Sequence, residues 1–99
     1  MNFIAQKVDA NGMSLASYAP DTLSMRAIAT SFPAGRMEGY EDSMKGYDGV
    51  EVGFVHVPTG MELYVYARWG MVRVGCRTYE RNDANQIAEE LVSFLTGGR

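Results

Sequence analysis

Residues 50–79 read VEVGFVHV-PTG-MELYVYARW-G-MVRVGCRTY. Three runs rich in β-branched and aromatic residues are separated by two turn signals, P-T-G and W-G. Runs of this composition, broken by short glycine-containing turns, are typical of antiparallel hairpins. The stretch therefore predicts a three-stranded meander.

The second hairpin of this meander has a register that can be derived from its side chains. A two-residue turn at Trp69-Gly70 pairs Tyr64 with Gly75 and Tyr66 with Arg73. Because strand side chains alternate between faces, the pairs separate into two sets, and a slip of one residue would mix them. We call one set the apolar face: Leu63, Val65, Ala67, Val72, Val74 and Cys76. We call the other the Tyr–Arg face: Glu62, Tyr64, Tyr66, Arg68, Arg73 and Arg77.

The first hairpin is predicted from its turn, Val57-Pro58-Thr59-Gly60. Proline in second place and a closing glycine favour a three-residue loop with a bulge. Val57 then pairs with Met61 and Val55 with Leu63, which puts both valines on the apolar face. The alternate residues fall beside Tyr64 and Tyr66: Val50, Val52, Phe54 and His56. Because strand 50–57 is then apolar on both sides, either a cover or a partner is expected on the Tyr–Arg face.

Composition limits the class of protein. A chain of 99 residues fits one domain, 1–99, and a hydrophobic share of 46% suffices for a core. The net charge of -3 argues against a nonspecific nucleic-acid binder. A single cysteine, Cys76, cannot form an internal disulfide, and no long apolar run or signal-peptide layout is present. We expect a cytoplasmic protein without a membrane span.

The N-terminal third predicts a hairpin and a helix. Asn11-Gly12 is a hairpin turn signal between residues 3–8 and 13–18, although a short helix before Asn11 is the alternative. Asp21 or Thr22 can then cap a helix over 21–32, which Pro33 ends. Its apolar residues recur at helical spacing: Met25, Ile28, Ala29 and Phe32.

Residues 34–49 are rich in glycine and acid. Gly39 and Gly46 oppose a helix by about 1 kcal/mol each, so the segment predicts a mobile acidic loop. Its carboxylates lack the alternating spacing and closing glutamate of a calcium loop, and we expect no metal.

The C-terminal segment predicts a helix with one apolar stripe. Asp83 can cap it, Gln86 completes a capping-box pattern, and Gly97 can end it. The stripe consists of Ala84, Ile87, Ala88, Leu91, Phe94 and Leu95. The expected fold is therefore α+β: an antiparallel sheet of three to five strands, with this helix and the 21–32 helix packed on one face.

Few residues offer chemistry. His56 is the single histidine, and the hairpin registers place it on the opposite face from Cys76, which excludes a His–Cys metal site. No nucleophile-elbow, P-loop or dinucleotide-binding pattern is present. We expect a non-enzymatic protein without a cofactor.

The Tyr–Arg face is the candidate binding surface, because tyrosine and arginine dominate interface hot spots. The predicted partner-binding residues are Tyr64, Tyr66, Arg68, Arg73, Arg77 and Tyr79. Their ordinary role would be that of solvent-facing strand residues stacked on one another. The functional hypothesis is a small acidic protein-binding module of immunity, inhibitor or adaptor type, with an edge strand available for a homodimer.

The alternative is single-stranded nucleic acid on the same face, with tyrosines stacking on bases. Val52-Gly53-Phe54-Val55 is similar to part of the RNP1 pattern of RNA-recognition domains. It lacks the leading basic residue and the second glycine–aromatic pair of that pattern.

Overall fold

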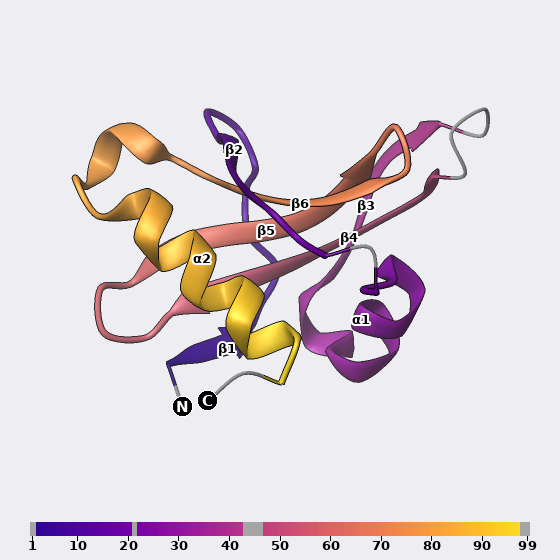
Figure 1. Ribbon diagram of the computed structural model, residues 1–99, viewed down its shortest axis with the longest axis horizontal. Coiled ribbons are helices and arrows are strands. Elements are labelled where there is room, and N and C mark those ends of the chain that lie inside the picture. Colours follow the sequence, from indigo (N-terminus) through magenta and orange to yellow (C-terminus); the bar gives the residue numbers. More distant parts are fainter. Residues whose placement is uncertain (1, 21, 43–46, 98–99) are drawn as a thin grey trace.

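The computed structural model describes residues 2–20, 22–42 and 47–97. These residues form a six-stranded antiparallel sheet with two α-helices, an α+β arrangement (Figure 1). The strands are β1 (Phe3–Ala5), β2 (Ser14–Tyr18), β3 (Arg36–Asp42), β4 (Tyr47–His56), β5 (Met61–Arg68) and β6 (Met71–Cys76). The helices are α1 (Met25–Ser31) and α2 (Ala84–Leu95). The α+β class is as predicted, but the sheet has more strands than the three to five expected.

The sheet order is β1-β4-β5-β6-β2, and β3 pairs with the other half of the β4 edge that β1 occupies. The predicted meander is therefore the centre of the sheet. In the second hairpin Tyr64 pairs with Gly75, Tyr66 with Arg73 and Arg68 with Met71, as the alternation of side chains requires. Leu63, Val65, Val74 and Cys76 have no exposed surface.

The register of the first hairpin differs from prediction by one residue. Phe54 pairs with Leu63 and His56 with Met61, so the loop is 57–60 and holds four residues. The Thr59 hydroxyl lies 2.8 Å from His56 Nδ1 and accepts the Met61 amide at 3.2 Å. These side-chain bonds favour the longer loop, in which Gly60 takes a φ of 74°. The shift puts Val52, Phe54 and His56 on the apolar face, and Val57 in the loop.

One apolar core includes residues of both helices and of the apolar face. The rings of Phe32 and Phe54 lie 5.1 Å apart, and Phe94 of α2 lies 5.8 Å from Phe32. The buried residues of α1 are Met25, Ile28 and Ala29, and those of α2 are Ala84, Ile87, Ala88 and Leu91. α1 begins later than expected because Ser24 caps it, and its Oγ accepts the Ala27 amide.

The cap of α2 also differs in its chemistry. Asp83 is the N-cap residue, but its side chain makes no capping hydrogen bond. Its carboxylate accepts from Arg81 Nε at 2.8 Å instead, and this bond lowers the pKa of Asp83. The Asp83 carboxylate therefore pairs with Arg81, two residues earlier in the chain, and does not form the predicted capping box.

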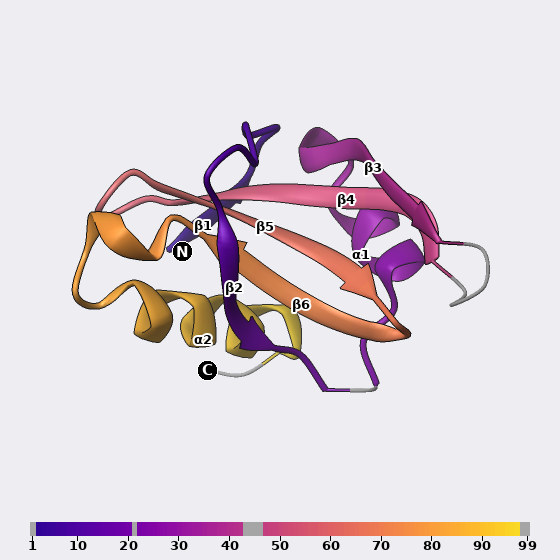
Figure 2. The ribbon, with the colours of Figure 1, turned by 90° about the horizontal axis from the view of Figure 1, so that it is seen from above.

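The N-terminal strands form where predicted but do not pair with each other. β1 pairs with β4, and β2 pairs with β6. Asn11-Gly12 does make a turn, in which the Met13 amide donates to the Ala10 carbonyl at 3.0 Å. The chain between the strands crosses the sheet on the side opposite α2, as Figure 2 shows. The predicted hairpin is wrong, because each strand bonds to a different edge of the meander.

The segment expected to be a loop contains β3. Its register with β4 shifts between Glu38 and Glu41, the interval that contains Gly39. A Cβ on Gly39 would collide with the Glu51 side chain, so this glycine admits a buried carboxylate on the neighbouring strand. The central part of the expected loop, 43–46, lies outside the described residues.

Candidate partner-binding surface

The centre of the Tyr–Arg face is a pair of buried tyrosines. Tyr64 and Tyr66 are stacked, with ring centroids 4.5 Å apart and an interplanar angle of 11°. Only 9% and 7% of their surfaces are exposed. A Cβ on Gly75 would collide with the Tyr64 ring, which lies across the bare backbone of that glycine. The expectation that these two rings face solvent is wrong.

The chain between β1 and β2, residues 6–13, crosses this side of the sheet, and we call it the crossing segment. Its Gln6 amide donates to the Gly53 carbonyl at 3.0 Å. A Cβ on Gly53 would collide with the Gln6 carbonyl, so the close approach of the two backbones requires glycine here. The Val8 amide points at the Met37 sulfur, 3.3 Å away. Residues that are remote in sequence therefore close this side of the sheet.

Arg77 forms hydrogen bonds with the C-terminal part of the crossing segment. It donates to the carbonyls of Asn11, at 2.9 Å, and Asp9. It also forms an ion pair with Glu62, at 3.1 Å, and the hydrogen bond between them raises the Arg77 pKa. The N–H groups of Arg77 thus form hydrogen bonds within the fold.

Arg68 lies beside the tyrosine pair and a buried acid. Its guanidinium carbon lies 5.2 Å from the centroid of the Tyr66 ring, and one terminal nitrogen lies 3.8 Å from Glu51. Glu51 is only 7% exposed. Burial, the neighbouring Tyr66 and Glu51 together raise the pKa of Tyr64 from 10.0 to about 12. Both rings are therefore neutral at physiological pH, because the pKa of Tyr66 is raised by burial as well.

Arg73 lies against two rings that the sequence did not group with it. Its guanidinium carbon lies over Tyr18 at 5.1 Å and over Trp69 at 5.2 Å. Tyr18 is brought there because it pairs with Arg73 across the β2–β6 ladder. The Arg73 Nε atom is buried without a hydrogen-bond partner, and no ion pair to Arg73 occurs among the described residues.

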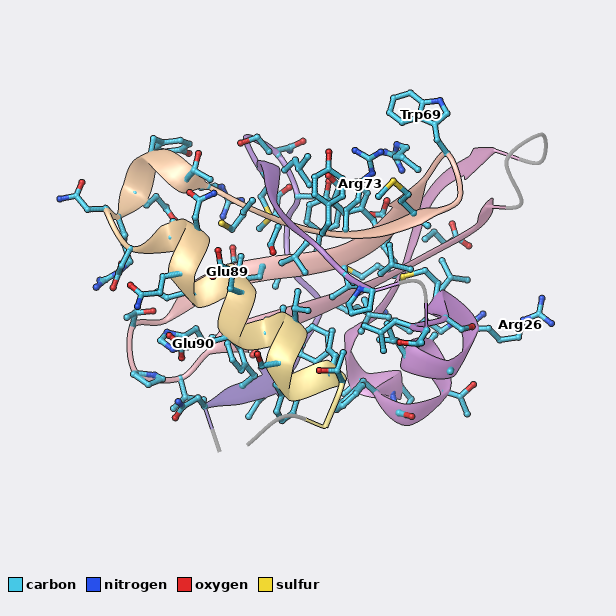
Figure 3. The ribbon with its side chains drawn as sticks, in the orientation of Figure 1. Arg26, Trp69, Arg73, Glu89 and Glu90 are labelled. Carbon is cyan, nitrogen blue, oxygen red and sulfur yellow. The ribbon has the colours of Figure 1, made fainter. Side chains whose placement is uncertain are left out.

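Trp69 is at the tip of the β5–β6 hairpin and projects away from the sheet, with Arg73 below it (Figure 3). Both turn residues have positive φ, 52° at Trp69 and 76° at Gly70, which is the type I′ pattern. Trp69 is the only non-glycine residue with positive φ in the described chain. Asparagine is the usual residue at this position, and a bulky side chain there is strained.

The exposed surface around this tip is aromatic and apolar. Trp69 is 63% exposed, Tyr18 51% and Met71 39%. We call these three residues and the half-buried Arg73 the tip surface. Tyr79, 75% exposed, lies elsewhere, with its hydroxyl near Gly12 at the turn of the crossing segment.

The six predicted residues are thus divided by the structure. Two are buried, two stabilise contacts within the fold, Arg73 belongs to the tip surface, and Tyr79 stands apart; their partner-binding role stays a prediction. The sequence analysis missed Tyr18, Trp69 and Met71. The hairpin register already placed Trp69 and Met71 at the tip, whereas Tyr18 depends on a nonlocal strand pairing.

His56 and Cys76 lie on the same face, which corrects the prediction that they lie on opposite faces. Both are buried, at 6% and 0% exposed, and the Cys76 thiol is directed at the Ala84 carbonyl. Burial raises the pKa of the Cys76 thiol. Within the described ranges, no three His, Cys, Asp or Glu side chains gather in a way that could hold a metal ion.

The chain matches no protein-family model, no curated protein and no solved structure. In the part of the chain that the structure describes, neither helix has the length and apolar character needed to span a membrane.

Proposed function

We propose that this chain is a small acidic, non-enzymatic protein-binding module of immunity, inhibitor or adaptor type, and that it binds its partner through the tip surface. The carrying observation is Trp69, which is 63% exposed in a turn whose backbone disfavours it. Strained residues that persist on a surface are often functional. Tryptophan, tyrosine and arginine are also the residues enriched in binding hot spots.

The tip surface differs from an ordinary scatter of exposed apolar residues. Its residues come from β2, the β5–β6 turn and β6, and Arg73 contacts both Tyr18 and Trp69. Contacts of this kind hold the side chains in place before a partner arrives, which reduces the entropy lost on binding. A single chain with this surface and an acidic overall charge fits the binding-module class.

A second copy of the chain is another partner that the sheet edge could accept. β2 is an outer strand, but its pairing with β6 is irregular between Leu15 and Ser17. The Asn85 side-chain amide also donates to the Ala16 carbonyl at 3.0 Å. Bulges and capped carbonyls make an edge less suitable for adding a strand. We therefore favour a different protein, bound at the tip, over a homodimer.

Nucleic acid is the weaker alternative. Tyr64 and Tyr66 would have to serve as stacking platforms, yet both rings are buried. Phe54, in the RNP1-like stretch, has no exposed surface and faces the core.

The reducing, cytoplasmic setting inferred from the single cysteine stays a prediction.

The test compares capture by three forms of the protein from an extract of the source cells. Immobilised wild type and Trp69→Ala are the main pair, and Val57→Ala is the matched control, because Val57 is 52% exposed in a different loop. A partner should be retained by wild type and by the control, and its affinity for Trp69→Ala should fall at least 30-fold on titration, as for a hot-spot truncation of about 2 kcal/mol. Equal retention by all three forms would contradict the tip surface.

A further inference from the structure

Arg73 differs from the other arginines around it in lacking an acid. Arg68 has Glu51 at 3.8 Å, Arg77 has Glu62 at 3.1 Å, and Arg81 has Asp83 at 2.8 Å. In the described chain, Arg73 is instead matched only with aromatic rings. No carboxylate of the described residues therefore neutralises its positive charge.

The position of the rings leaves one part of this guanidinium suited to binding. Rings contact the flat faces of a guanidinium, whereas its N–H groups point outward in the plane, in a fork that matches a carboxylate. Tyr18 and Trp69 also exclude water from part of the group, and its Nε is buried without a partner. A partly desolvated cation is attracted to an anion more strongly than a fully hydrated one.

We propose that Arg73 receives the carboxylate of an aspartate or glutamate side chain from the partner protein. The inference rests on the proposed function and specifies its chemistry. The acid is flanked by apolar residues in its own chain, because Arg73 lies against the exposed rings of Tyr18 and Trp69, and Met71, two residues away on β6, is exposed as well. The partner segment thus presents one acid within an apolar stretch.

The overall charge of the protein limits how acidic the partner segment can be. With a net charge of -3, the chain repels strongly acidic partners at long range. An acidic tail or a nucleic acid would meet that repulsion along its whole length. A single carboxylate among apolar residues gains the contact with Arg73 at short range and avoids most of the repulsion.

The test begins with a displayed library of random twelve-residue segments, selected in parallel on wild type and on Trp69→Ala. Segments enriched only by wild type should contain one Asp or Glu between apolar residues. The best of them is then synthesised with free charge removed from both ends, together with a twin in which the acid is changed to the matching amide.

Binding of the two peptides is followed by the fluorescence of Trp69, the single tryptophan of the chain. The acidic peptide should bind at least tenfold more tightly than its amide twin on the unaltered protein. Arg73→Gln should remove this preference, and Arg73→Lys should retain part of it because lysine keeps the charge but not the fork. Thermal melts of both variants check that the fold is intact, and the peptide pair on wild type needs no variant at all.

Four outcomes would overturn the inference. Trp69-dependent segments without an acid, or an amide twin that binds equally well, would remove the carboxylate but leave the proposed function standing. If no segment prefers wild type over Trp69→Ala, a linear acidic segment is excluded as the ligand. The capture experiment then decides the proposed function separately. Quenching of Trp69 fluorescence by an oligonucleotide, if it depends on Arg73, would show that Arg73 binds a nucleic-acid phosphate and not a carboxylate of a protein.

Discussion

The two faces of the sheet are both closed, but by different means. On the apolar face, Leu63, Val65 and Val74 are fully buried by hydrophobic side chains of the core. On the Tyr–Arg face, two tyrosines are buried as a stacked pair with Arg68 beside them, and a backbone segment crosses the same side of the sheet. The first face is sealed throughout, whereas the second opens at the hairpin tip. Alternation along a strand therefore identifies which residues share a face, and does not reveal whether that face is covered.

The largest expected effect is on the apolar face. Leu91→Ala should lower the free energy of unfolding by about 2–5 kcal/mol, because Leu91 is fully buried and a cavity would remain. Urea denaturation measures it, with Glu90→Ala on the exposed side of α2 as the control. A loss below about 1 kcal/mol would mean that α2 contributes little to the core.

The next effect tests whether the Tyr–Arg face is as closed as the burial of its rings indicates. Tyr66→Ala should cost about 2–4 kcal/mol, since the ring is 7% exposed and stacked on Tyr64. Tyr79→Ala, with the same residue type at 75% exposure, should change stability by about 0.5 kcal/mol or less. Similar thermal and urea midpoints for the two variants would contradict the cover over the sheet.

A pH experiment examines the same tyrosine pair. Folding raises the pKa of Tyr64 from 10.0 to about 12, so the folded state prefers the neutral phenol. That contribution is fully present below pH 10 and is lost as the pH rises through 12, with a total of about 1–2 kcal/mol. Urea midpoints measured across this range should fall less steeply for Tyr64→Phe than for wild type. Parallel curves would show that Tyr64 titrates alike in both states.

The smallest effect has the opposite sign and concerns the open end of the second face. Trp69→Asn should relieve about 1 kcal/mol of strain in the type I′ turn. It also loses the contact with Arg73, which contributes about 0.5 kcal/mol at an exposed site. The net expectation is a stabilisation of about 0.5 kcal/mol, seen as a higher melting temperature. Trp69→Phe retains the backbone strain and should show no such gain.

The β5–β6 hairpin was predictable because its turn and its alternation are local and agree with each other. The β4–β5 register was not, since a bond between His56 and Thr59 selected a loop one residue longer. β3 was missed because Gly39 reads as a breaker, while in the fold it makes room for the side chain of Glu51. In both failures a specific side-chain contact outweighed the turn or breaker signal, within one loop in the first case and between two strands in the second.

The candidate site was half predictable for the same reason. The pairing of Arg73 with Tyr66 follows from the hairpin sequence, and the structure has both residues in that register. The approach of Gln6 to Gly53 depends on β1 pairing with β4, and the contact of Arg73 with Tyr18 depends on β2 pairing with β6. Neither pairing has a signature within the segments themselves, because β1 and β2 read equally well as partners of each other.

The pairing of the first two strands has a consequence for the order in which the chain folds during synthesis. β1 and β2 leave the ribosome early, but β4 begins only at residue 47 and β6 at residue 71 of 99, so the strands they bond to are made much later. Until then the local Asn11-Gly12 turn favours the wrong hairpin between them. The meander must form first and then take up the N-terminal strands at its two edges, so closure of the sheet is a late, nonlocal step of the kind that slows folding.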